Sequence, residues 1–115
     1  MKWTCPSELL PKDEIDAHNI RTAYLASSVA AELGMSIEDQ INLHCGGIYH
    51  DVGKKRVNPF VLNKASRLTA RERAEVEHHV LLGIDLIKHV PGAYQWAYLV
   101  RSHHERLDGS GYPDG

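Results

Sequence analysis

Histidines and carboxylates recur along this 115-residue chain at positions where they could together bind metal ions. The chain has eight histidines, a large number for its length. Histidine nitrogen and carboxylate oxygen are the ligands that hold catalytic zinc, iron or manganese in proteins. The candidate ligands, in chain order, are Glu14, His18, His50, Asp51, His79, His103 and His104. Their types and repetition predict a site that holds more than one metal ion.

The spacing of two pairs carries further information. Glu14 and His18 are four residues apart, so on a helix they share one face and could chelate a metal, although a solvated acid–histidine pair would look the same. Neighbouring helical residues point about 100° apart, so His50 and Asp51 can both reach one site only near a helix end. Gly53 supplies such an end. The Asp51 carboxylate could there bridge two metals, with one oxygen on each.

Residues that follow these pairs extend the pattern. Lys54 is placed to meet a phosphate oxygen. The plainer alternative to a functional site is that His50-Asp51 is a chance pair at a helix end, where the lysines that follow offset the helix dipole. We expect His79 rather than His78 to face the site, because Gly83 lies four residues further on and could permit a close helix approach. The two histidines that we expect at the surface are His44 and His89.

Apolar periodicity and helix-ending residues predict an all-α fold. The expected helices span residues 12–33, 37–51, 70–87 with a kink near 79, and 93–105. Gly34 is placed to end the first helix, and Ser36 and Thr69 are placed to cap the second and third. Residues 54–63 are expected to form a loop or a short helical turn, and residues 108–115 a turn-rich loop.

The same pattern proposes residues for the core. In the first helix the apolar stripe consists of Ile15, Ile20, Tyr24 and Val29. In the last helix the residues available to the core are Tyr94, Ala97, Tyr98 and Val100. We expect Cys45 to be a small buried side chain.

Composition excludes several classes of protein. A net charge of −2 gives no general attraction to nucleic acid or to anionic membranes. Cys5 and Cys45 form no CxxC motif, which is consistent with a reducing compartment. No segment approaches the roughly 20 apolar residues of a membrane-spanning helix, and the N-terminus lacks a secretory signal. We therefore expect one small cytoplasmic domain.

Two strings of residues resemble the motifs of a known family. The HDxGK motif of HD-superfamily phosphohydrolases resembles His50-Asp51-Val52-Gly53-Lys54, and the HHExxDGxGYP motif of the HD-GYP subgroup resembles residues 103–113. The likeness extends from Glu14 to Gly115. It implies an HD-domain helical bundle, with about four to five helices visible and residues 1–115 forming the metal-binding core of an HD-GYP domain.

The resemblance implies a metal-dependent phosphodiesterase that converts bacterial cyclic di-GMP to linear pGpG, GMP or both through a metal-bridged hydroxide. All seven candidate ligands named above match metal ligands of the family, with Asp51 as the bridge. Lys54 matches the lysine that assists at the scissile phosphate. Glu14 matches a glutamate of members that hold a third metal. Two or three divalent ions are implied, with iron or manganese favoured and zinc possible.

The second motif also implies a loop that contacts substrate or partner signalling domains, including diguanylate cyclases. Its residues are Arg106, Asp108, Gly109, Gly111, Tyr112 and Pro113. Family members continue past this motif into helices that carry a last aspartate ligand. The resemblance therefore implies that residues 1–115 hold an incomplete metal set.

Two alternatives remain beside the phosphodiesterase. One is an HD phosphohydrolase for another nucleotide, which Gly111-Tyr112-Pro113 disfavours because generic HD hydrolases lack that loop. The other is a catalytically inactive signalling module that binds partners through the same loop. The intact His50-Asp51 and Lys54 disfavour this module.

Overall fold

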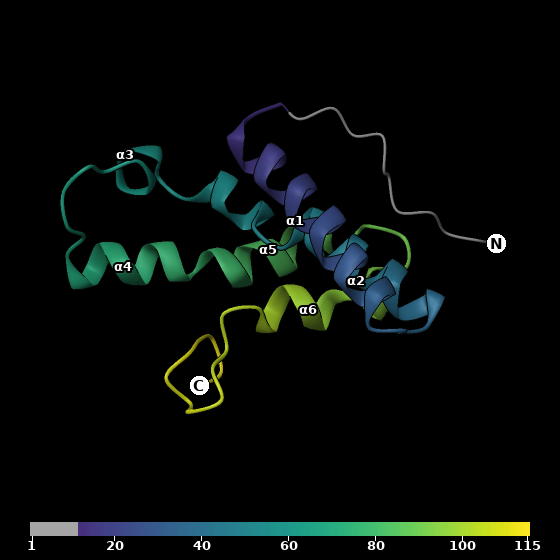
Figure 1. Ribbon diagram of the computed structural model, residues 1–115. Helices are drawn as coiled ribbons and strands as arrows, with labels where there is room; N and C mark the ends of the chain where they lie inside the picture. Colours follow the sequence, from purple (N-terminus) through teal and green to yellow (C-terminus); the bar gives the residue numbers. More distant parts are fainter. Residues whose placement is uncertain (1–11) are drawn as a thin grey trace.

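The computed structural model describes residues 12–115, so the prediction concerning Cys5 lies outside the described residues. No strand occurs in this part of the chain, which confirms the all-α prediction (Figure 1). The α-helices are α1 (Glu14–Glu32), α2 (Ile37–Tyr49), α3 (Pro59–Leu62), α4 (Ala70–Glu77), α5 (His79–Ile87) and α6 (Ala97–Ser102). The 3-10 helices are η1 (Val52–Arg56) and η2 (Ala93–Gln95).

Side-chain caps start α1, α2 and α4. The Asp13 carboxylate accepts a hydrogen bond from the Asp16 N–H at the start of α1. Ser36 caps α2 in the same way, as predicted. At the start of α4 the predicted capping box forms, because Thr69 and Glu72 each accept a hydrogen bond from the other's backbone N–H.

Gly34 ends α1, as predicted. Its φ of +72° lies in the left-handed region that favours glycine. The N–H groups of Gly34 and Met35 donate to the carbonyls of Ala31 and Ala30, which gives a Schellman motif. The chain therefore turns sharply from α1 into α2, and the two helices pack side by side (Figure 1).

The predicted helix over residues 70–87 is divided into α4 and α5 at His78, which confirms the kink near His79. The predicted helix over 93–105 was wrong in extent. It consists of η2 and the shorter α6, and the break lies at Trp96, where φ is −131°. This break lets the Trp96 side chain enter the core, where it is fully buried and stacks on Tyr49 with ring centroids 5.1 Å apart.

The break also changes which residues of this segment are buried. The core position proposed for Val100 is confirmed, but Tyr94 and Tyr98 are 82% and 58% exposed. In α1, Tyr24 and Val29 of the proposed stripe are half exposed, and the small Ala23 and Ala30 are buried instead. Cys45 is fully buried, as predicted. Small side chains are buried in α1 because α2 approaches its backbone closely.

Two glycines permit the closest contacts between elements. A Cβ on Gly47 of α2 would lie 2.6 Å from the Cα of Ala23 in α1. A Cβ on Gly53 of η1 would lie against the carbonyl oxygen of His79 in α5. Gly83, expected to permit a helix approach, faces Gly53 with ordinary spacing. Close packing therefore requires glycine at positions 47 and 53, which lie on either side of the His50-Asp51 pair.

The elements surround this pair. In Figure 1, α1 and α2 form one side of the molecule, α4 and α5 run together as a long arm, and α6 lies below them. Helix α5 packs against η1 and α6, and α6 also packs against α2. The chain after α6 forms a loop below α5 (Figure 1). Among residues 12–115, no helix is long and apolar enough to cross a membrane.

Replacement of Gly53 by alanine tests the contact between η1 and α5. The added methyl would overlap backbone atoms of His79 and Gly83, so we expect Gly53→Ala to lower the free energy of unfolding by about 1–3 kcal/mol or more. The matched control is Gly83→Ala, whose Cβ would meet atoms only at 3.5 Å or beyond. That helical substitution should stabilise the protein by about 0.5–1 kcal/mol. Urea unfolding followed by circular dichroism measures the free energy of unfolding of both variants. Equal changes in the two would contradict the close contact at Gly53.

Candidate metal centre

The centre of the site is the Asp51 carboxylate, which lies between α2 and η1 and is 3% exposed. Its Oδ1 atom is 3.1 Å from Nε2 of His79 and 3.2 Å from Nε2 of His103. Its Oδ2 atom is 3.2 Å from Nε2 of His18 and 3.3 Å from Nε2 of His50. The two oxygens therefore face two different sets of histidines.

The candidate ligand atoms form two groups that share Asp51, and within each group they lie within 4.8 Å of one another. One group, here called the Oδ2 group, consists of His18, His50 and Asp51. The other, the Oδ1 group, consists of Asp51, His79, His103 and His104. This is the arrangement expected of a carboxylate that bridges two metal ions. The folded chain thus brings together six of the seven ligands proposed from the sequence.

Glu14 is the seventh ligand, and it lies outside both groups. Its side chain is 81% exposed, and its Oε1 accepts a 2.7 Å hydrogen bond from Nη2 of Arg21. It does line a surface cavity together with His18, Asp51 and Lys54. A third metal at Glu14 stays a prediction from the family resemblance.

Three of the histidines are oriented by backbone carbonyls that precede them in the chain. Nδ1 lies 2.6 Å from the Gly47 carbonyl oxygen in His50, 2.7 Å from that of Val76 in His79, and 2.8 Å from that of Val100 in His103. Each contact joins a histidine to the residue three positions earlier. An Nδ1–H that donates to a carbonyl leaves the Nε2 lone pair free for a metal.

This orientation makes the site suited to cations. The Nε2 lone pairs of these histidines point at carboxylate oxygens, and Nε2 of His18 lies 3.1 Å from Nε2 of His50. Nε2 of His79 is buried and has no hydrogen-bond partner among the described residues. Acceptors that face acceptors at this distance repel unless a cation or proton lies between them. The donor set therefore fits divalent metal ions held by nitrogen and oxygen.

The ionisation of the site agrees with that function. Burial raises the pKa of the Asp51 carboxyl, but in the metal-free protein His103, His50 and His79 outweigh it when protons on their Nε2 atoms face the carboxylate, and they hold the pKa far below the usual range. Burial, followed by the nearby His103 and His79, lowers the pKa of His104 to about 4. At neutral pH the carboxylate is therefore charged and the His104 imidazole neutral, which are the forms that bind metals.

Lys54 lies on the Oδ2 side of the site. Its Nζ is 3.1 Å from Oδ2 of Asp51, and its side chain is partly exposed. An open cavity of about 320 Å³ begins there. The cavity is lined by Glu14, Ile15, His18, Asp51, Lys54, Leu62 and Asn63. An anion in this cavity would meet the Lys54 ammonium next to the metal ligands.

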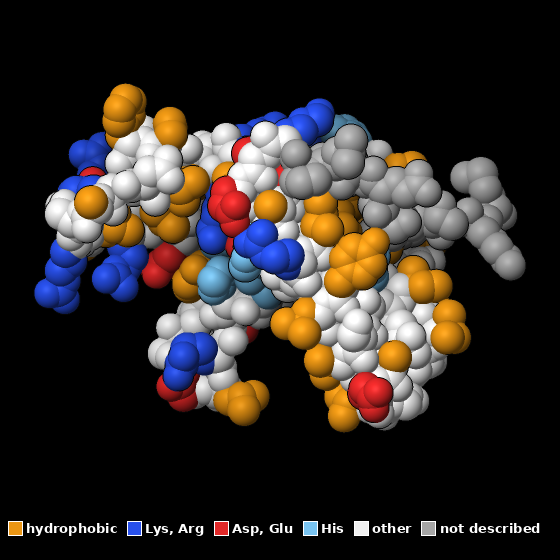
Figure 2. Space-filling model, turned by 45° about the horizontal axis from the view of Figure 1, so that its top comes forward, with side chains coloured by type: hydrophobic (Ala, Val, Ile, Leu, Met, Phe, Trp, Pro, Cys, Tyr) orange, Lys and Arg blue, Asp and Glu red, His pale blue; other side chains and the backbone are white. Residues whose placement is uncertain are grey.

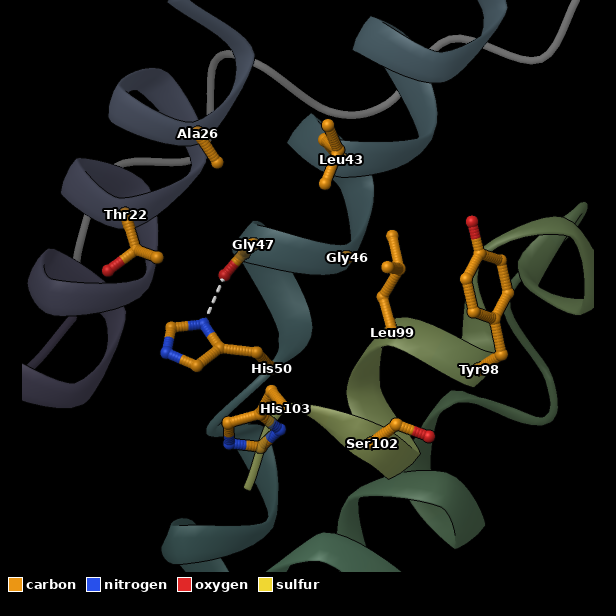
Figure 3. Close-up of a pocket in the computed structure, with 10 residues that line it drawn as sticks. All are labelled: Thr22, Ala26, Leu43, Gly46, Gly47, His50, Tyr98, Leu99, Ser102 and His103. Atoms are coloured by element: carbon orange, nitrogen blue, oxygen red, sulfur yellow. Dashed lines mark hydrogen bonds between the residues drawn. The ribbon is translucent and has the colours of Figure 1, made fainter. Parts of the chain in front are cut away.

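A second cavity, of about 350 Å³, lies on another side of the same histidines, between α1, α2 and α6 (Figure 3). Its walls are almost entirely apolar and include Leu43 and Leu99, with His50 and His103 at one end. Gly46 and Gly47 leave the part of the α2 wall between Leu43 and His50 without side chains (Figure 3). The site thus has a polar and an apolar hollow beside it. In Figure 2 a group of histidine side chains lies at the middle of the face, close to basic and acidic side chains.

The loop proposed for substrate or partners divides into two parts. Arg106, Asp108 and Gly109 are exposed, and Asp108 accepts hydrogen bonds from Ser110. Gly111, Tyr112 and Pro113 are half-buried instead. The ring of Tyr112 stacks on His104 with centroids 4.7 Å apart. Sequence patterns gave no sign of this contact, because stacking between neighbouring loop segments has no periodic signature.

The remaining histidines are partly as expected. His78 and His89 are exposed, which agrees with the choice of His79 and with the prediction for His89. The surface prediction for His44 was wrong. It is half-buried, its Nδ1 lies 3.3 Å from the Ser27 hydroxyl, and its ring contacts Tyr24 edge-on. The close packing of α1 on α2 places it there.

Comparison with known proteins gives consistent matches. A family model described as HD domain matches residues 8–115. The chain is 35% identical over 98 residues to 3′3′-cGAMP-specific phosphodiesterase 1 of Vibrio cholerae, covering 85% of this chain and 23% of that protein. It is 35% identical over 97 residues to the cyclic di-GMP phosphodiesterase response regulator RpfG of Xanthomonas campestris, covering 83% and 26%. A cyclic di-GMP phosphodiesterase of Thermotoga maritima is 32% identical over 104 residues, covering 89% and 28%. The chain thus spans about a quarter of the length of these relatives.

The lowered pKa of His104 predicts how the metal-free protein responds to acid. Burial and then its histidine neighbours bring that pKa to about 4, against about 6.5 for an unfolded histidine. The unfolded chain therefore binds more protons between these values, so stability is highest above about pH 6.5 and is lost as the pH falls towards 4. Urea midpoints of the chelator-treated protein should fall over this range.

The control for this measurement is His104→Gln, which should flatten the pH dependence. Asp51 does not contribute in the same window. Its folded pKa lies below the value of about 3.9 in the unfolded chain, so its stabilisation is lost only at more acidic pH. Identical pH profiles for the wild type and His104→Gln would contradict the assignment.

Proposed function

Because the chain belongs to the HD domain family, whose model it matches over residues 8–115, we propose that it is the metal-binding core of a cyclic di-GMP phosphodiesterase of the HD-GYP type. The observation that carries this proposal is the Asp51 carboxylate, shared by two groups of histidines with Lys54 beside it. Relatives named cyclic di-GMP phosphodiesterases support the substrate. Because the chain spans only part of these relatives, the activity is proposed for the protein that contains it.

The proposed chemistry is hydrolysis of a phosphodiester. Two divalent ions at such a site lower the pKa of water and stabilise charge on phosphoryl oxygens. The chain's own contribution is to hold the ligands in place. Asp51 offers one oxygen to each group, and backbone carbonyls keep the Nε2 atoms of His50, His79 and His103 directed at the site. Iron or manganese is the proposed metal, and zinc also suits the ligands.

Lys54 is proposed to bind the scissile phosphate. Its Nζ pairs with Oδ2 of Asp51 across 3.1 Å and borders the polar cavity. When cations share the Asp51 charge, the ammonium becomes available to a phosphoryl oxygen in that cavity. A positive charge placed where negative charge develops stabilises the transition state.

Three further candidates are distinguishable. Relatives named 3′3′-cGAMP-specific phosphodiesterases match as well as those named for cyclic di-GMP, so the mixed dinucleotide is a second candidate substrate. An HD phosphohydrolase would prefer another nucleotide. An inactive module would bind diguanylate cyclase or other signalling domains through the exposed residues Arg106, Asp108 and Gly109, with or without metal. All of these roles would place the protein in the cytoplasm, where such nucleotides occur.

Removal of the bridging carboxylate tests the metal centre. We expect Asp51→Asn to lose metal from both groups and to abolish hydrolysis of cyclic di-GMP, since each group uses one Asp51 oxygen. Metal content after anaerobic loading with Fe(II) or Mn(II), together with chromatography of the products pGpG and GMP, measures both effects. Asp85→Asn is the control, because Asp85 is an exposed carboxylate paired with Arg56 and Lys88. Full metal content in Asp51→Asn would refute the bridge.

The adjacent lysines allow a matched test of phosphate binding. We expect Lys54→Gln to retain its metals but to lower turnover by about 100-fold, as loss of a group that stabilises developing charge does. Lys55→Gln should be nearly neutral for turnover, because Lys55 instead pairs with Asp13 and Asp16. The assay uses cyclic di-GMP and 3′3′-cGAMP in parallel to identify the preferred substrate. Equal turnover in the two variants would remove Lys54 from the mechanism.

A further inference from the structure

His104 differs from the other histidines of the Oδ1 group in how its ring is held. The Nδ1 atoms of His79 and His103 contact backbone carbonyls at 2.7 and 2.8 Å. Among residues 12–115, neither ring nitrogen of His104 makes such a contact to a carbonyl. An imidazole without a second hydrogen bond is free to rotate about its last side-chain bond, and rotation would move its ligand nitrogen. Another contact must therefore define this ring.

That contact comes from Tyr112. The two rings are nearly parallel, with an angle of 16° between their planes and 4.7 Å between centroids. His79 lies beside the same ring, which it meets edge-on at 5.1 Å, and the ring of His103 lies 4.2 Å from it, tilted by 47°. Turning the His104 imidazole would break the stack and drive it into a neighbour. The His104 ring is thus stacked on one aromatic face and flanked by two fellow ligands.

The backbone keeps Tyr112 in place. The Tyr112 N–H donates to the carbonyl oxygen of His104 at 3.3 Å. A Cβ on Gly111 would lie 2.3 Å from the same carbonyl oxygen, so only glycine permits this return of the chain. The loop therefore folds back onto the histidine that precedes it.

A second set of contacts holds the far side of the loop. Arg101 of α6 forms a two-point ion pair with Asp114, with distances of 3.0 and 2.7 Å. The Glu105 carboxylate accepts hydrogen bonds from the N–H groups of Asp114 and Gly115. These contacts join the segment after Tyr112 to Arg101 of α6 and to Glu105 just beyond α6, so the aromatic ring is presented to His104 from a closed loop.

We propose that Tyr112 is a positioning residue, whose ring sets the orientation of the His104 imidazole and thereby the metal affinity of the Oδ1 group. This inference rests on the metal centre of the proposed function. It gives Gly111-Tyr112-Pro113 a role inside the domain, distinct from the partner contacts that the family resemblance implies. Only the aromatic face is required, so phenylalanine should replace tyrosine.

The test isolates the Oδ1 group. His18→Ala removes a ligand found only in the Oδ2 group, and Mn(II) binding to this background is followed by electron paramagnetic resonance of the free ion. In this background we expect Tyr112→Leu to weaken Mn(II) binding about tenfold, the scale seen when a residue orienting a ligand is lost. Tyr112→Phe should bind within about twofold of the background, because it retains the stacking ring. Tyr94→Leu, a substitution at a tyrosine that is 82% exposed, is the control.

A double-mutant cycle separates positioning from a general effect on folding. With His104→Ala present, Tyr112→Leu should cause no further loss, because no imidazole remains to be positioned. The inference would be overturned if the losses of Mn(II) affinity in the cycle were additive, or if Tyr112→Leu left the affinity unchanged. It would also be overturned if Tyr112→Phe and Tyr112→Leu lost the same affinity. Should Tyr112→Leu fail to fold by circular dichroism, Tyr112→Met provides the second variant without a ring. A wild type that binds no Mn(II) would refute the metal centre itself, whereas normal wild-type binding with an additive cycle refutes only the role of Tyr112.

Discussion

The structure depends on the burial of one charged group, the Asp51 carboxylate. An ionised carboxylate removed from water is costly unless positive or polar groups surround it. Here those groups come from five elements that are spread along the sequence. The side chains that reach Asp51 belong to His18 of α1, His50 at the end of α2, Lys54 of η1, His79 of α5 and His103 after α6. The requirement to neutralise Asp51 and the convergence of the helices are therefore the same constraint.

That convergence needs close contacts between backbones. Gly47 lets α1 approach α2, which brings His18 next to His50, and Gly53 lets η1 lie against the carbonyl of His79. Gly47 has a second role, because its carbonyl oxygen accepts the Nδ1 proton of His50. The main chain thus positions and orients the ligands at once. Such a preorganised ligand set binds a metal without first ordering mobile side chains.

Local features of the chain were predictable to the extent that neighbouring residues determine them. Ser36, Thr69 and Gly34 act on hydrogen bonds within a few residues of themselves, and the helix ends that they predict are confirmed. Burial was less predictable, because it depends on which element lies opposite. Tyr94 and Tyr98 are exposed and His44 is half-buried for that reason. The break at Trp96 decided the first two cases, and the α1–α2 contact decided the third.

By itself, the sequence determined the all-α class, the helix ends marked by Gly34, Ser36 and Thr69, and the identity of six side chains that the fold brings together. These follow from residue types, short spacings and a motif that resembles a known family. Only the tertiary structure decided how those side chains divide into two groups around Asp51, and that Glu14 pairs with Arg21 outside both. It also decided that Tyr112 stacks on His104. Spacing along a chain specifies direction over a turn or two, whereas these contacts depend on how separate elements pack, which no local pattern encodes.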